Sequence, residues 1–168
     1  MMEAASHVSE RAAELRRDFD RSFAEPPRAD KAAKEDLLAI RLGAQGFAIR
    51  LSEITGLFVD KKVTRVPGAS AALLGIAGFR GSIVPVYDLQ SLLGHSGGHA
   101  PRWLVIAAAA PVAFAFEAFE SQLRVSPESI TPQQSNAETH RYTQDFFQTE
   151  NVLRPIIHLY SVLDAIKA

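Results

Sequence analysis

The chain has 168 residues, of which 47% are hydrophobic and 22% charged, and its formal net charge is −1. This length is enough for one compact domain or two small ones, and the near-neutral charge argues against a nucleic-acid-binding protein, which would carry a basic surface. The absence of cysteine excludes disulfides, thiolate metal sites and cysteine nucleophiles, and it fits a cytoplasmic protein.

An amphipathic helix is predicted over residues 6–24. Its apolar residues recur at helical spacing along one face: Val8, Ala12, Leu15, Phe19 and Phe23. Pro26 and Pro27 end this helix, and a charged linker runs on to residue 36. The helix either docks on its own domain or contacts a partner; in the second case Leu15 and Phe19 are candidate partner-binding residues.

No segment of the chain is expected to enter a membrane. The first thirty-six residues are charged and lack the apolar core of a secretory signal. The longest apolar run, residues 103–116, is interrupted by Pro111 and is too short to span a bilayer. We therefore expect a soluble cytoplasmic protein without direct membrane insertion.

From Leu37 onward, the apolar residues alternate with a period of two, which is typical of β-strands. Residues 38–42 and 47–51 predict a first hairpin, and 76–79 with 83–87 predict another across Arg80 and Gly81. Short strands are predicted at 57–59 and 63–66. A glycine-rich connector, residues 94–101, follows.

The second half repeats this organisation. Strands are predicted at 103–108, 112–116, 122–125 and 152–159, with a long polar loop over 131–144 and a closing helix over 161–167 capped by Ser161. Residues 85–93 (PVYDLQSLL) are echoed by residues 155–163 (PIIHLYSVL). The sequence predicts a mainly β protein with a helical extension (1–36) and one domain (37–168) of two barrels, at about 37–94 and 102–168.

One motif suggests catalysis. Residues 94–98 (GHSGG) match the nucleophile elbow G-x-S-x-G of α/β-hydrolases around Ser96, and Asp145 and His158 follow in hydrolase order. The elbow requires a strand that leads into a sharp turn and a helix that leaves it. Here a leucine-rich helical turn precedes Ser96 and Pro101 follows it, so we favour a flexible connector and keep a small serine hydrolase as the lesser alternative.

Metal and cofactor sites are not expected. His95 and His99 are four residues apart, but Gly97 and Gly98 between them disfavour the helix that would align two ligands. His158 lies in a predicted strand of large apolar residues, which favours a histidine of the core or of an interface over a catalytic base.

Several motifs of the first half, in this order and spacing, resemble the CheW-like family, the coupling proteins of bacterial chemotaxis. They are Leu42-Gly43, Phe47-Ala48-Ile49, residues 63–68 (VTRVPG), Leu74-Gly75-Ile76, Arg80-Gly81 and residues 83–89 (IVPVYDL). The second half is similar more loosely, so that the resemblance covers about residues 37–166 and leaves the N-terminal helix unexplained.

The resemblance implies a pair of five-stranded SH3-like barrels without catalytic activity. Such proteins are scaffolds of two-component signal transduction: they couple the cytoplasmic tips of methyl-accepting chemoreceptors to the regulatory domain of a CheA-type histidine kinase, in receptor arrays at the inner membrane. The alternative is a divergent CheW-like accessory protein that binds another regulator through its N-terminal helix.

The chain departs from the family at the central turn. The family usually has Asn-Leu-Arg-Gly there, whereas this chain has Gly78-Phe79-Arg80-Gly81. Gly56 replaces the acidic residue expected to face the arginine, and Glu53 is the nearest substitute. The expected partner-binding residues are Ile54, Gly56, Gly75, Phe79, Arg80 and Val84. Each of these residues also has a structural interpretation. Arg80 would tie the turn to a neighbouring strand, and Gly75 and Gly81 would supply a positive φ. The side chains of Ile54, Phe79 and Val84 would belong to the core.

Overall fold

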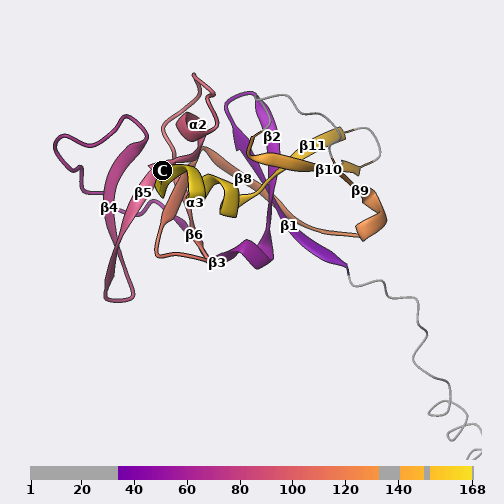
Figure 1. Ribbon diagram of the computed structural model, residues 1–168, viewed down its shortest axis with the longest axis horizontal. Coiled ribbons are helices and arrows are strands. Elements are labelled where there is room, and N and C mark those ends of the chain that lie inside the picture. Colours follow the sequence, from indigo (N-terminus) through magenta and orange to yellow (C-terminus); the bar gives the residue numbers. More distant parts are fainter. Residues whose placement is uncertain (1–33, 133–140, 150–151, 168) are drawn as a thin grey trace, which may run out of the picture. The chain divides into compact units, whose positions relative to one another are not determined.

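The computed structural model describes residues 34–132, 141–149 and 152–167. The predicted helix at 6–24, with Leu15 and Phe19, lies outside the described residues. In the described part, most residues of regular structure are in β-strands, and these strands form two mixed sheets, accompanied by two short α-helices (Figure 1). No helix among the described residues is long and apolar enough to cross a membrane.

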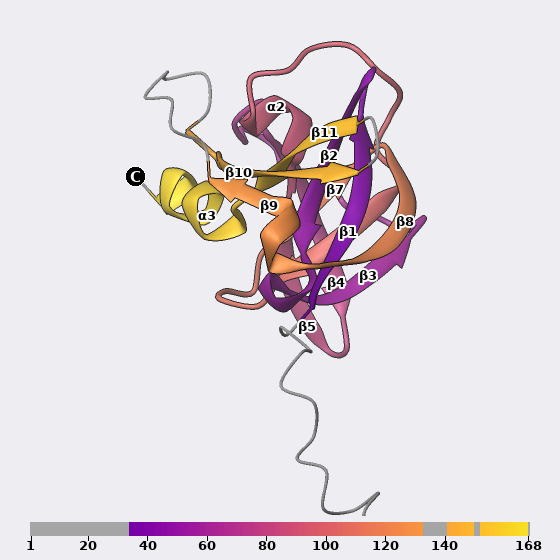
Figure 2. The same ribbon diagram turned by 90° about the vertical axis from the view of Figure 1, so that its right-hand side faces the viewer.

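Sheet A has six strands in the order β8-β1-β2-β11-β10-β9 (Figure 2). Their bounds are β1 Glu35–Leu42, β2 Gln45–Arg50, β8 Ala118–Val125, β9 Ile130–Pro132, β10 Thr143–Thr149 and β11 Val152–Ile157. Sheet B has five strands in the order β3-β6-β7-β5-β4. Their bounds are β3 Ile54–Val59, β4 Leu73–Phe79, β5 Ser82–Asp88, β6 Trp103–Ala107 and β7 Ala113–Phe116.

Helices follow the last strand of each half of the chain. Helix α2 (Leu89–Leu92) follows β5 and helix α3 (Leu159–Lys167) follows β11, while the 3-10 turns η1 (Leu51–Glu53) and η2 (Pro127–Ser129) connect strands. The sequence echo between residues 85–93 and 155–163 therefore marks two equivalent strand-then-helix units. The parallel pairings are equivalent too, because β5 pairs with β7 and β11 pairs with β2.

The two halves of the chain exchange their first hairpins. The hairpin β1–β2 belongs to the first half by sequence, but it pairs with β8 and β11 of the second half. The hairpin β6–β7 of the second half pairs with β3 and β5 of the first half. The expected boundaries of the barrels, 37–94 and 102–168, are therefore wrong as barrel boundaries: they delimit the sequence repeats, while each sheet takes strands from both repeats.

Each sheet closes around a core of its own. In sheet B the edge strands meet, since the rings of Phe58 (β3) and Phe79 (β4) lie 4.8 Å apart between centroids. In sheet A, Leu123 and Val125 of β8 pack in one cluster with Ile130 of β9 and Phe147 of β10. These contacts confirm the prediction of two small barrels, with β9 as a sixth strand beyond the five expected in the second.

A third core joins the barrels, and it explains why the exchanged hairpins are apolar on both faces. On β2, Ala48 points into barrel A, while Phe47 and Ile49 point into the junction between the sheets. On β7, Ala113 and Ala115 point into barrel B, while Phe114 and Phe116 point into the same junction. Strands buried on both faces lose the polar alternation of a one-sided sheet.

Some local predictions differ from the structure. The segment 63–66 is not a strand but makes a single antiparallel bridge between Thr64 and Ile76, and the predicted loop over 131–144 includes the ends of β9 and β10. Helix α3 begins at Leu159, so Ser161 lies inside the helix and does not cap it. The predicted hairpins and the connector at 94–101 are confirmed.

Gly75 offers a direct test of the packing around β4. Its φ is +148°, and a Cβ at this position would overlap the carbonyl oxygen of Thr64, which takes part in the bridge to Ile76. We expect Gly75→Ala to lower the free energy of unfolding by about 2–4 kcal/mol, measured by urea denaturation. Gly78→Ala is the control, because a Cβ there meets nothing within 4 Å, and a loss as large as that of Gly75→Ala would contradict this description.

Candidate partner-binding groove

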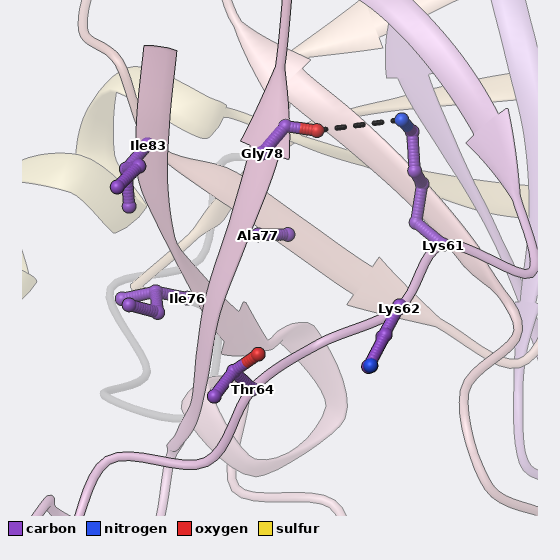
Figure 3. Close-up of a pocket in the computed structure, with 7 residues that line it drawn as sticks. All are labelled: Lys61, Lys62, Thr64, Ile76, Ala77, Gly78 and Ile83. Carbon is purple, nitrogen blue, oxygen red and sulfur yellow. Dashed lines mark hydrogen bonds between the residues drawn. The ribbon is translucent and has the colours of Figure 1, made fainter. Parts of the chain in front are cut away.

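An open groove of about 380 Å³ lies on the outside of barrel B (Figure 3). We call it the outer groove and define it by its lining residues: Lys61, Lys62, Thr64, Ile76, Ala77, Gly78 and Ile83. These residues come from the β4–β5 hairpin and from the segment between β3 and β4. The surface therefore combines two isoleucines with two ammonium groups.

The alternation of the β4–β5 hairpin produces the apolar side of the groove. Val84 points into barrel B and is 3% exposed, so its neighbour Ile83 points outward and is 73% exposed. Ile83 pairs with Gly78 across the hairpin, and Gly78 has no side chain to cover it. A large aliphatic side chain that is exposed beside a hollow is suited to burial against a partner.

On the other side of the groove, Lys61 packs against the rings of Phe58 and Phe79. The ammonium of Lys61 lies 5.1 Å from the ring centroid of Phe79 and 5.7 Å from that of Phe58, a cation–π arrangement. Lys61 Nζ also donates a hydrogen bond of 3.3 Å to the carbonyl oxygen of Gly78, drawn as the dashed line in Figure 3. These contacts fix a positive charge at the groove rather than leaving it on a free side chain.

The segment that carries the two lysines is anchored at its start. Asp60 has a φ of +51°, and Arg102 donates hydrogen bonds of 2.9 and 2.7 Å to its carboxylate. These hydrogen bonds and the charge of Arg102 lower the pKa of the Asp60 carboxyl. The backbone N–H of Asp60 also donates to the carbonyl oxygen of Arg102. This pair joins the end of β3 to the residue before β6.

Five of the expected partner-binding residues in the described part of the chain are buried or half-buried. Phe79 and Val84 are buried in the core of barrel B, so the expectation that they touch a partner is corrected: they support the groove from beneath. Ile54 packs against the junction core, and Gly56 lies against the ring of Phe58, where a Cβ would be 2.8 Å from a ring carbon. Gly75 is buried at the bridge to Thr64.

Of the expected site residues that the structure describes, Arg80 is the one that is exposed. It lies at the turn between β4 and β5, and its φ is +47°. Among the described residues, no ion pair is formed with it. The suggestion that Glu53 stands in for the acid facing Arg80 is wrong, because the Glu53 carboxylate accepts a hydrogen bond of 2.6 Å from the backbone N–H of Leu159 instead.

The geometry around Ser96 does not assemble a hydrolase site in the described part of the chain. His158 lies 3.5 Å from Asp145, but its Nε2 is 2.7 Å from a guanidinium nitrogen of Arg50. Ser96 lines a separate hollow in the 94–101 connector. The histidine and the serine are thus not hydrogen-bonded to each other, as nucleophilic activation requires.

The two histidines of the connector have separate partners. The ring of His95 packs edge-on against Phe47, at 5.4 Å between centroids. His99 lies 3.0 Å from the carboxylate of Glu117, and its hydrogen bonds to that group lower the pKa of the Glu117 carboxyl. Within the described ranges, no cluster of three metal-ligating side chains forms.

The sequence prediction missed the groove's own residues, Lys61, Lys62, Ile76 and Ile83. A signal for Ile83 was present, because strict alternation in residues 83–87 places Ile83 opposite to Val84 and Val86. The lysines carry no comparable signal, since their place at the groove depends on the long-range bridge between Thr64 and Ile76.

The described residues thus form two interlocked small barrels, with an apolar and basic groove on the outside of barrel B as a candidate binding site. A model of the CheW-like domain matches residues 36–167, and the chain therefore belongs to the CheW-like family. It is 30% identical over 59 residues to a probable chemotaxis protein CheW of Rhizobium etli, a match that covers 35% of this chain and 38% of that protein.

A solved structure shares the fold. The scaffolding protein TtCheW from Thermoanaerobacter tengcongensis superimposes with a TM-score of 0.67 at 18% sequence identity, over 74% of this chain and 88% of that one. The curated relative is thus matched over well under half of its length, while the solved structure is matched over most of its chain.

Substitutions of Arg80 test whether its side chain stabilises the fold. A non-glycine residue at positive φ costs about 1–2 kcal/mol, and the greater freedom of glycine in the unfolded chain offsets part of the gain from replacing it. We therefore expect Arg80→Gly to raise the free energy of unfolding by about 0.5–1 kcal/mol in urea denaturation, and Arg80→Ala, which keeps the strain, to leave it nearly unchanged. A clear loss of stability in both variants would show that the guanidinium stabilises the fold.

Proposed function

We propose that the protein is a non-enzymatic coupling adaptor of bacterial chemosensory signalling. It binds the regulatory domain of a CheA-type histidine kinase and the cytoplasmic tip of a methyl-accepting chemoreceptor, and it works in the cytoplasm at receptor arrays. Membership of the CheW-like family and the shared fold support this proposal. The observation that carries it is the outer groove, where Ile83 is exposed beside Lys61 and Lys62.

The groove has the composition of a protein-binding surface rather than that of a catalytic site. An exposed isoleucine gains about 1.5–3 kcal/mol when it is fully buried, and a partner that covers Ile83 therefore gains a central apolar contact. The ammonium groups at the rim favour acidic residues around that contact, and they contribute mainly to orientation and association rate. We assign the groove to the receptor tip, with Arg80, exposed at the turn of the same β4–β5 hairpin, as a further contact.

A charge placed on Ile83 tests this assignment. Ile83→Asp removes the apolar contact and would bury a carboxylate, so we expect its affinity for a purified receptor cytoplasmic fragment to fall by about 10- to 100-fold. Isothermal titration calorimetry with the full chain measures this. Binding of the kinase regulatory domain, measured in the same way, should change much less.

The matched control is Val152→Asp, which places the same charge on an exposed apolar residue of barrel A, 49% exposed. It should bind the receptor fragment like the wild type. Equal affinities of Ile83→Asp and the wild type would remove the groove from the receptor contact. If the wild type binds neither partner at about 50 μM, the coupling function itself is wrong.

A further inference from the structure

Five ionisable side chains gather where β2, η1, β10 and α3 meet. Arg50, at the end of β2, donates hydrogen bonds to the carboxylates of Glu35 on β1 and Asp145 on β10. Its Nη1 lies 2.7 Å from Nε2 of His158, the residue before α3. A guanidinium only donates, so Nε2 accepts and the ring proton is on Nδ1. That nitrogen faces Glu53, with 3.6 Å between Nδ1 and Oε1.

Glu53 joins the two repeats at this point. Its side chain is 4% exposed, and Oε2 accepts a hydrogen bond of 2.6 Å from the backbone N–H of Leu159, the first residue of α3. Its own carbonyl oxygen accepts from the N–H of Ala108, just after β6. A residue of the first repeat thus caps the helix of the second.

In the first repeat, by contrast, the helix is capped by the residue that directly precedes it. Helix α2 is capped by Asp88, whose carboxylate accepts from the N–H of Gln90 at 3.2 Å. His158 occupies the position of Asp88 in the sequence echo. The hydrogen-bond acceptor at the N-terminus of α3 therefore comes from Glu53, which is 106 residues away in the chain.

A buried cap of this kind responds to protons. Burial raises the pKa of the Glu53 carboxyl, and the hydrogen bond from Leu159 and the charge of Arg50 offset only part of that effect. If α3 moves away, water reaches Glu53 and its pKa returns toward the ordinary value of 4.5. The docked state then has the higher pKa and binds the proton more tightly, so acid favours docking. Docking therefore weakens as the pH rises from the ordinary pKa of Glu53 through the raised pKa of the docked state.

We propose that Glu53, held beside His158, is a proton-linked clasp on helix α3, which holds the helix more tightly in acid and loosens it as the pH rises. The ionisable groups around Glu53 from the packed elements are Glu35, Arg50, Asp145 and His158. Helix α3 contributes Leu159, Val162 and Leu163 to the junction core. Its loosening opens the junction while the barrel interiors stay closed.

Hydrogen exchange of the full-length chain between pH 4.5 and 8 tests the clasp (a range chosen about the ordinary carboxyl value). After correction for intrinsic exchange, the protection of the α3 amides should fall as the pH rises, by at most about tenfold per pH unit for one proton. The protection of β6 and β7 should not follow it. Glu53→Gln keeps an acceptor for the N–H of Leu159 but cannot ionise, and it should flatten the pH dependence in α3.

Glu117→Gln is the matched control. Glu117 also accepts a backbone N–H from the other repeat, that of Gly43 at 3.0 Å, but it does not contact α3, so its α3 profile should match the wild type. An α3 profile in Glu53→Gln that keeps the wild-type slope would overturn the proposal, as would α3 protection that changes only together with β6 and β7. The wild-type profile alone decides the question if the variant fails to fold. These readouts do not involve a receptor or kinase.

Discussion

The structure depends on the apolar junction between the two barrels. Two hairpins, β1–β2 and β6–β7, are each buried on both faces, one toward a barrel interior and the other toward the junction. The large side chains Phe47, Phe114 and Phe116 fill the junction. Each hairpin also completes the sheet of the opposite repeat. Neither barrel can therefore form without strands from both halves of the chain.

This arrangement leaves a particular surface for partners. Since β6–β7 fills the middle of sheet B, the β4–β5 hairpin lies at its edge, with one face on the core and the other outside. Ile83 and the lysines of the outer groove lie on that outer face. A rigid barrel that presents an exposed aliphatic side chain is suited to bridging other proteins, because little conformational entropy is lost on binding.

Much of the fold can be predicted from the sequence, and the predictions that are wrong have physical causes. Alternating residues and turn signals identified most strands, and the echo of 85–93 in 155–163 identified the repeat. The exchange of hairpins was missed because strand partners are chosen by long-range burial, which local periodicity does not encode. The cap of α3 was assigned to Ser161 for a similar reason: the group that caps it, Glu53, is distant in sequence.

The candidate site was predicted in part. The Gly-Phe-Arg-Gly turn indicates the correct hairpin, but burial places Phe79 and Val84 inside the barrel, while Arg80 is exposed. The groove needs residues 61–64 to pack along β4, through the bridge between Thr64 and Ile76 and the hydrogen bond from Lys61 to Gly78. No local pattern in the sequence signals these contacts.

The most direct test of this account is whether the two barrels unfold as one unit. Trp103, the single tryptophan, lies on β6 in sheet B, and the methyl resonances of Ile156 report on sheet A. In urea, the fluorescence of Trp103 and the intensity of the native Ile156 signal should fall in one coincident transition, because the exchanged hairpins couple the sheets. Two separate transitions, with one barrel folded while the other is not, would contradict the account.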